Sequence, residues 1–159
     1  MSGGSVQARV VSPGHRLLEL PELAFALFAF LLNFVWEMLQ VPFFVGVPLM
    51  PHWDAVLFCT RATLGDAGIA VVAFWLVAGT TAAGRGWALR PGRRHVIAFV
   101  AAGVGITAVL EIFFTRVWPR WTYSQMMPIL PLLDVGVVPI LQWVVLPPLI
   151  VWLVRRHLT

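Results

Sequence analysis

Residues 33–40, with the sequence NFVWEMLQ, place three polar side chains inside an otherwise apolar segment. Asn33, Glu37 and Gln40 are spaced i, i+4 and i+7, so a helix carries them on one face. A carboxylate in hydrocarbon is costly, and such a group normally faces the interior of a bundle or a water-filled cavity. The stretch therefore predicts a membrane-spanning helix whose polar face is turned towards protein.

The composition of the whole chain agrees with this interpretation. The 159 residues are 60% hydrophobic and have a mean hydropathy of +0.87, whereas soluble domains are about 45–50% apolar. Four apolar stretches each approach the ~20 residues that cross a bilayer. We predict an all-α integral membrane protein, a four-transmembrane-helix bundle over 23–156 with spans at about 23–45, 55–83, 96–116 and 135–155. An N-terminal tail at 1–22 precedes the bundle, and a short C-terminal end at 157–159 follows it.

The positions of the charges predict the topology. All eleven basic residues are Arg. Eight flank one side of the predicted spans, and only Arg61, Arg116 and Arg120 fall on the other. By the positive-inside rule, both termini are cytoplasmic (N-in/C-in), and we predict a bacterial cytoplasmic (inner) membrane location. Topology thus accounts for the net charge of +4. No nucleic-acid partner is expected, because no reader motif accompanies the basic residues.

Two further spans carry polar stripes. Cys59, Thr63 and Asp66 repeat the i, i+4, i+7 spacing, and Glu111 belongs to an i+4 series that begins at Gly103. The fourth span contains Gln142 and three prolines (Pro139, Pro147 and Pro148), which predict a kinked helix. Between the third and fourth spans, Trp and Tyr residues predict a loop that lies in the membrane interface or folds back over the bundle.

The four helices offer polar groups at a similar depth. At ~1.5 Å per residue, Glu37, Asp66, Glu111 and Gln142 all fall in the outer half of the bilayer, which predicts one cavity opening outwards. The candidate catalytic residues are Glu37, Asp66 and Glu111. The candidate substrate-binding residues are Asn33, Trp36, Gln40, Arg61, Thr107, Arg116, Tyr123, Gln142 and Trp143.

Structural roles are the alternative for several of these residues. Asn33, Gln40 and Gln142 can join helices by hydrogen bonds. Glu37 and Glu111 can form ion pairs with Arg61 or Arg116. Asp54 and Asp134 each precede a predicted helix, and we expect them to be N-caps. His52 and Cys59 lack the spacing of metal ligands, so no metal site is expected, and Ser124 has no partner His that would make it a nucleophile.

Three functions fit a chamber of this kind. Two carboxyl groups in a low-dielectric pocket can hold different protonation states, one as general acid and one as general base. This favours an enzyme that isomerises, hydrates or hydrolyses a lipid or isoprenoid-like small molecule drawn from the membrane lipid bilayer, with no cofactor required. A proton or cation transporter is a second hypothesis, although the inner halves of the helices are apolar. The third is a small accessory or scaffold subunit of a larger membrane complex, in which a partner helix or a pigment satisfies the polar stripes. As partners, the chain can have copies of itself in a homo-oligomer or the other subunits of such a complex.

Overall fold

The computed structural model describes residues 20–159, so the predicted tail lies almost wholly outside the described residues. The described chain is mostly helical. Its four long helices are α2 (Pro21–Gln40), α3 (His52–Thr80), α4 (Arg93–Ile112) and α5 (Val137–Leu158). All four are long and apolar enough to cross a bilayer. This confirms the predicted helical fold class, and it fits a membrane protein.

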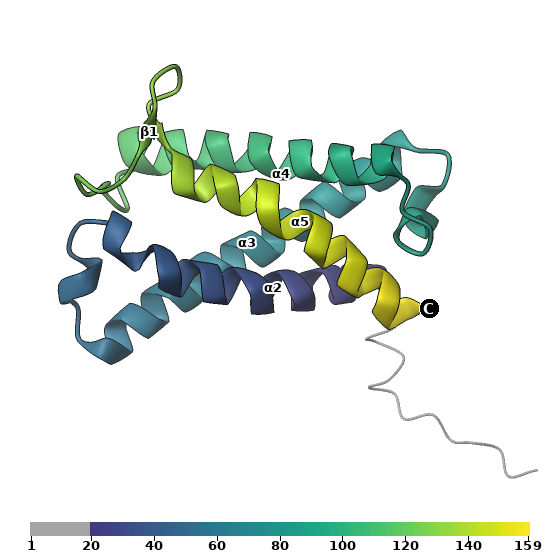
Figure 1. The fold of residues 1–159 in the computed structure, drawn as a ribbon, viewed down its shortest axis with the longest axis horizontal. Coiled ribbons are helices and arrows are strands. Elements are labelled where there is room, and N and C mark those ends of the chain that lie inside the picture. The colour runs from purple at the N-terminus through teal and green to yellow at the C-terminus, as the bar shows by residue number, and fades with distance from the viewer. Residues whose placement is uncertain (1–19) are drawn as a thin grey trace, which may run out of the picture.

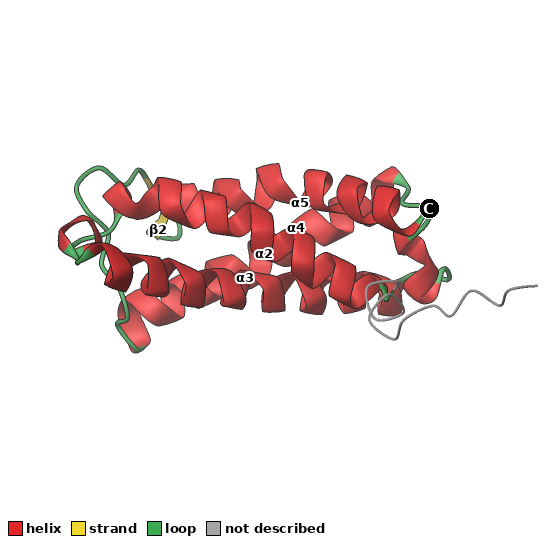
Figure 2. Cartoon of the chain, turned by 90° about the horizontal axis from the view of Figure 1, so that it is seen from below, coloured by secondary structure: helices red, strands yellow, loops and turns green. Residues whose placement is uncertain are grey.

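The helices form two layers, with α2 and α3 in one and α4 and α5 in the other (Figures 1 and 2). Helix α2 packs against α3 and α5, and α4 packs against α5 and α3, so the ring of contacts is closed. We call the end that holds the start of α2 and the end of α5 the terminal end. The opposite end holds a two-stranded antiparallel ribbon, β1 (Ile129–Leu130) and β2 (Val135–Gly136), and we call it the ribbon end.

Aromatic side chains fill the bundle near the terminal end. Phe25, Phe74, Trp87 and Phe99 are completely buried. The ring of Phe25 lies 5.1 Å from those of Phe74 and Phe99 and 5.3 Å from that of Trp87, between centroids. The Trp87 indole donates to the carbonyl of Phe74 at 3.3 Å, so its polar atom is satisfied. This half of the bundle is a buried apolar core.

Helices α4 and α5 meet closely at Gly103. A Cβ atom at this position would lie 2.0 Å from the ring of Trp143, which is buried. Only glycine therefore leaves room for the indole between the two helices.

The helix boundaries correct two expectations. Helix α3 begins at His52 with Pro51 at its N-cap, so Asp54 lies within the first turn and is not the N-cap. There its charge still complements the helix dipole. The N-cap of α5 is Gly136, and Asp134 instead sits in a turn with φ of 52°. Both N-cap predictions were wrong because the helices begin at other residues than the sequence suggested.

Other boundaries differ only slightly from the expected ones. Pro21 is the first residue of α2. Proline is favoured in the first turn of a helix because an N–H at this position would have no partner within the helix. Helix α5 continues without a break through Pro147 and Pro148. The kink expected there stays a prediction, as does the orientation of the bundle across the membrane.

The segment between α4 and α5 folds back over the ribbon end. The Val45 amide donates to the carbonyl of Thr122, and the Ser124 amide donates to the carbonyl of Phe43, both at 2.9 Å. The Ser124 hydroxyl also donates to the carbonyl of Pro42 at 3.0 Å. These bonds hold residues 122–124 against the chain that follows α2, and they confirm the predicted fold-back of the loop.

Candidate functional site

A cavity of about 270 Å³ lies between the four helices in the half of the bundle nearer the ribbon end. Its polar lining comes from every helix: Glu37, Gln40, Arg61, Asp66, Thr107, Glu111 and Gln142. Its apolar lining includes four aromatic rings, those of Phe44, Phe58, Phe114 and Trp121. The structure therefore brings together the carboxyl groups whose spacing and depth predicted a shared chamber.

Gln142, in the wall of this cavity, joins α5 to α2 and α3 by side-chain hydrogen bonds. Its side-chain amide donates to Asn33 Oδ1 at 2.7 Å and to Asp66 Oδ2 at 2.9 Å, and Glu37 Oε1 lies 3.5 Å away. Asn33 in turn donates to the carbonyl of Ala29 at 2.7 Å. Asn33 and Gln142 thus have the joining role that was the alternative to substrate binding, and Gln142 also faces the cavity.

Glu37 lies beside the side-chain amides of Gln40 and Gln142. The Gln40 amide donates to Glu37 Oε1 at 2.5 Å, and both side chains are buried. Asp66, on the neighbouring helix α3, lines the same cavity, and the Gln142 amide nitrogen lies 2.9 Å from Asp66 Oδ2 and 3.5 Å from Glu37 Oε1. Glu37 and Asp66 are therefore joined through one amide group of α5.

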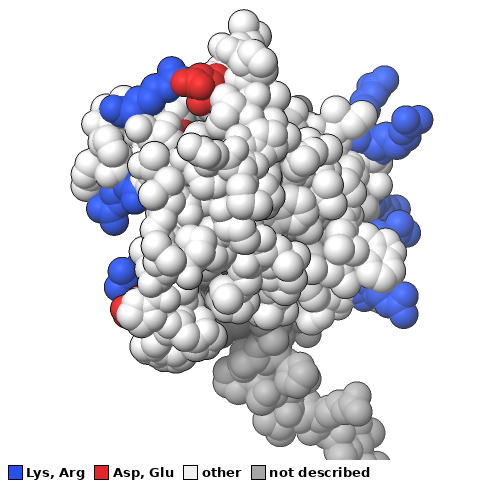
Figure 3. Space-filling view, turned by 60° about the vertical axis from the view of Figure 1, so that its left-hand side comes forward, with Lys and Arg blue, Asp and Glu red and all other residues white. Residues whose placement is uncertain are grey.

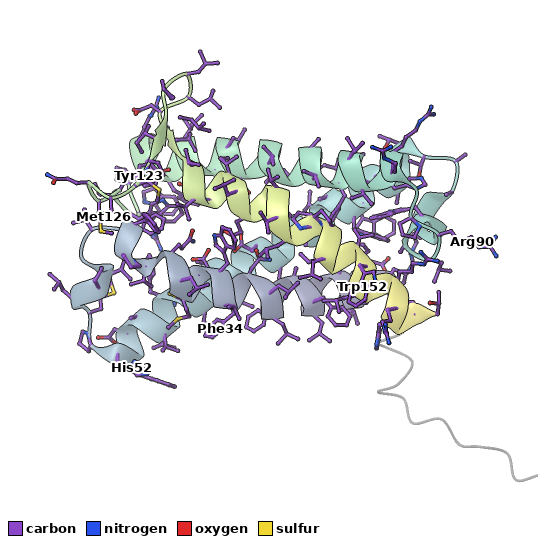
Figure 4. The ribbon with its side chains drawn as sticks, viewed as in Figure 1. Phe34, His52, Arg90, Tyr123, Met126 and Trp152 are labelled. Atoms are coloured by element: carbon purple, nitrogen blue, oxygen red, sulfur yellow. The ribbon has the colours of Figure 1, made fainter. Side chains whose placement is uncertain are left out.

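Glu111 is held by the loop that covers the ribbon end. The Tyr123 hydroxyl and the Trp121 indole, the latter at 3.3 Å, both donate to Glu111 Oε2. Within residues 20–159 no donor reaches Glu111 Oε1. Burial, followed by the nearby charge of Glu111, raises the pKa of Tyr123 above its usual value, so its hydroxyl remains a donor. Figure 4 labels Tyr123 where this loop meets the bundle.

Neither of the two expected counter-charges pairs with a carboxyl group of the cavity. In the described part of the chain the ion pairs are Arg85–Glu22 at 2.8 Å and Arg116–Asp134 at 3.2 Å. Arg116 also donates to the carbonyl of Leu133 at 2.7 Å, so it fastens the turn of the ribbon and does not line the cavity. Arg61 lines the cavity from an exposed position and forms neither ion pair. The structural alternative, in which Glu37 and Glu111 form ion pairs with Arg61 or Arg116, is therefore not found in the described chain.

Five of the predicted binding residues do not line the cavity: Asn33, Trp36, Arg116, Tyr123 and Trp143. Trp143 is buried against Gly103, and Trp36 is half-buried in the apolar core. Tyr123 contacts the site through Glu111. Conversely, the sequence did not single out Trp121 as a site residue. Its position two residues before Tyr123, in a loop expected to fold back, was the available signal.

Cys59 and Thr63 contribute to packing rather than to the cavity wall. Cys59 Sγ lies 3.7 Å from the carbonyl of Glu37, and the Thr63 hydroxyl donates to the carbonyl of Cys59 at 2.8 Å. Across residues 20–159, no three His, Cys, Asp or Glu side chains are grouped so that they could hold a metal ion.

Comparison with known protein families, with curated proteins and with solved structures gave no match for this chain.

Proposed function

We propose that this protein is an intramembrane enzyme that performs acid/base chemistry on a lipid or isoprenoid-like substrate. The observation that carries the proposal is the meeting of Glu37, Asp66 and Glu111 at one cavity in a membrane-type bundle. None of the three belongs to an ion pair of the described chain. A carboxyl group in such a position is costly to stability, and that cost is commonly associated with function.

The arrangement supplies an acid and a base. Glu111 is fixed by two donors on one oxygen, which leaves the other oxygen for the substrate. Glu37 and Asp66 form the second carboxyl site. In a double-bond isomerisation, one site gives a proton to one alkene carbon while the other removes a proton from the allylic carbon next to the second alkene carbon. The double bond then moves by one position and the number of protons is unchanged. Asp66 would relay or hold the proton of Glu37.

The cavity suits an apolar substrate of which only part is enclosed. Phe44, Phe58 and Phe114 provide an apolar wall. A volume of about 270 Å³ is at the lower limit of ligand pockets. A long-chain substrate would therefore place its reacting part in the cavity and leave the remainder in the bilayer.

The Arg distribution supports an outward-facing cavity. Among the described residues, Arg85, Arg90, Arg93, Arg94, Arg155 and Arg156 belong to the terminal end, and Arg61, Arg116 and Arg120 to the ribbon end. Figure 4 labels Arg90 at the terminal end, and Figure 3 shows the basic side chains in separate groups with a broad uncharged surface between them. We propose that the terminal end faces the cytoplasm of a bacterial inner membrane. The cavity then opens towards the outer leaflet.

The apolar filling of the other half argues against transport. A through-path for protons or cations would have to cross the completely buried cluster around Phe25 and Trp87. We therefore favour chemistry within the cavity over passage through the bundle.

The first test is mass spectrometry of the molecules that co-purify with the wild-type protein in nanodiscs, followed by turnover of any molecule identified. Glu37→Gln and Glu111→Gln should retain the fold and lower turnover by at least about a hundredfold, the usual effect of losing a general acid or base. Asp54→Asn removes an exposed carboxylate outside the cavity and is the matched control. Unchanged turnover in both glutamine variants would contradict the proposal.

A further inference from the structure

We propose that the polar end of the cavity's ligand is a protonated amine carried on an apolar body. This inference rests on the proposed function, because it names the substrate class of the same cavity. It is carried by the unused hydrogen-bonding capacity of the cavity wall together with the carboxyl groups around it.

The amide and indole donors of the wall are already directed to acceptors within the protein, so the Thr107 hydroxyl and the exposed Arg61 are the remaining side-chain donors of the lining. The Gln40 amide donates to Glu37, and the Gln142 amide donates to Asn33 and Asp66. The donors of Tyr123 and Trp121 are directed to Glu111. A ligand that offers only acceptors would therefore find few partners.

Within the cavity lining, the buried atoms without a partner are the Gln40 amide oxygen, which can only accept, and the Thr107 hydroxyl, which can accept as well as donate. The two residues are only 5% and 6% exposed. Glu111 Oε1 adds a third oxygen that receives no donor within residues 20–159. Buried polar atoms are nearly always paired, so these oxygens indicate a ligand that brings several donors.

The charges of the wall favour a positive group over a neutral one. Glu37, Asp66 and Glu111 all face the cavity, and neither ion pair of the described chain includes them. Arg61, at an exposed position, is the one basic residue in the lining. An ammonium group brings three donors and a positive charge, whereas a hydroxyl brings one donor and none. The ring of Trp121 in the wall also suits a cation.

The experiment compares three amphiphiles with the same alkyl chain: a primary amine, an alcohol and a trimethylammonium salt. Saturable binding to the full-length wild-type protein in nanodiscs is measured by calorimetry, after subtracting binding to empty nanodiscs. We expect the amine to bind at least about tenfold more tightly than the alcohol, which lacks the charge, and than the trimethylammonium salt, which lacks N–H donors.

Variants then locate the binding. Glu111→Gln should weaken amine binding by about tenfold or more, and Thr107→Val by a smaller factor, whereas Asp54→Asn should leave it unchanged. Amine binding that is no tighter than that of either comparison compound would overturn the inference, as would amine binding that Glu111→Gln leaves unaltered. The comparison on the wild-type protein decides the question even if a variant fails to fold.

The two proposals fail in different ways. Preferential amine binding with unchanged turnover in the glutamine variants would refute the enzyme and keep the amine site. Turnover of a neutral substrate that is lost in those variants, without amine preference, would refute the amine site and keep the enzyme.

Discussion

Tyr123 donates its hydroxyl hydrogen to Glu111, so the loop between α4 and α5 is tied to the carboxyl group of α4. The same oxygen also accepts the Trp121 indole hydrogen at 3.3 Å. Two side chains of one loop therefore orient a single carboxyl group at the cavity. The covering loop and the candidate catalytic residue are therefore one structural unit. A substitution in the loop should alter the position of the Glu111 carboxyl group, and a substitution of Glu111 should loosen the loop.

The first prediction concerns the ionisation of Tyr123, the only tyrosine of the chain. Its pKa is raised above the ordinary value of 10, first by burial and then by Glu111. A raised folded-state pKa means that the associated stabilisation is fully present below the unfolded-state pKa and is lost as the pH rises through the folded-state pKa. The near-ultraviolet absorbance of phenolate should therefore develop only well above pH 10. In Glu111→Gln it should develop at lower pH, because the neighbouring charge is gone; an identical titration in both proteins would contradict the contact.

A second prediction tests the Tyr123 hydrogen bond directly. Tyr123→Phe keeps the ring against Phe44, whose centroid is 5.9 Å away, and removes only the hydroxyl. We expect a loss of about 1–2 kcal/mol in the free energy of unfolding, since a hydrogen bond to an acidic group is removed. Thermal unfolding in detergent measures this. Combining Tyr123→Phe with Glu111→Gln should cost less than the sum of the two single changes; strict additivity would show that the two residues are uncoupled.

A third prediction concerns the approach of α4 to α5. Gly103→Ala should destabilise the protein by about 1–3 kcal/mol, because the new Cβ meets the rigid ring of Trp143. Gly105→Ala is the matched control on the same helix, where a Cβ meets nothing within 4 Å. It should be neutral or stabilising by up to ~1 kcal/mol through helix propensity. Equal melting temperatures for the two variants would show that the contact with Trp143 is not a constraint.

A fourth prediction addresses Gln142. Gln142→Met has a similar shape but no amide, so it leaves Asn33 Oδ1 and Asp66 Oδ2 without their donor. We expect a cost of about 1–3 kcal/mol, the penalty for unsatisfied buried polar groups. Leu141→Met, at the exposed neighbouring position, is the control and should change stability by less than about 0.5 kcal/mol. A Gln142→Met protein as stable as the wild type would show that the network does not hold the helices together.

A fifth prediction separates Arg116 from the cavity. Arg116→Ala should loosen the ribbon turn, since Arg116 holds Asp134 and the carbonyl of Leu133. Because the pair is exposed, the loss of stability should be about 0–1 kcal/mol. Hydrogen exchange of the amides in residues 132–134 should rise, while turnover and amine binding stay at the wild-type level. A large loss of binding would restore Arg116 as a counter-charge of the cavity.

The sequence by itself determined the helices and the faces that they bury. Apolar length predicted the four spans, and the spacing of Asn33, Glu37 and Gln40 predicted their shared burial, because a helix fixes which residues lie on one face. Because Glu37 and Glu111 fall at similar depths along their helices, the sequence also predicted that they share one cavity, and both line it. These are consequences of regular geometry, which a sequence encodes locally.

The tertiary structure alone decided the partners of the charged groups. Arg116 and Asp134 are separated by 18 positions, and the left-handed turn at Asp134 brings them together. The same folding back of the loop delivers Trp121 and Tyr123 to Glu111, a carboxyl group that the sequence left equally available to Arg116. Loop conformation depends on turns and packing that have no period along the chain, so side-chain direction there is set only when the loop meets the bundle.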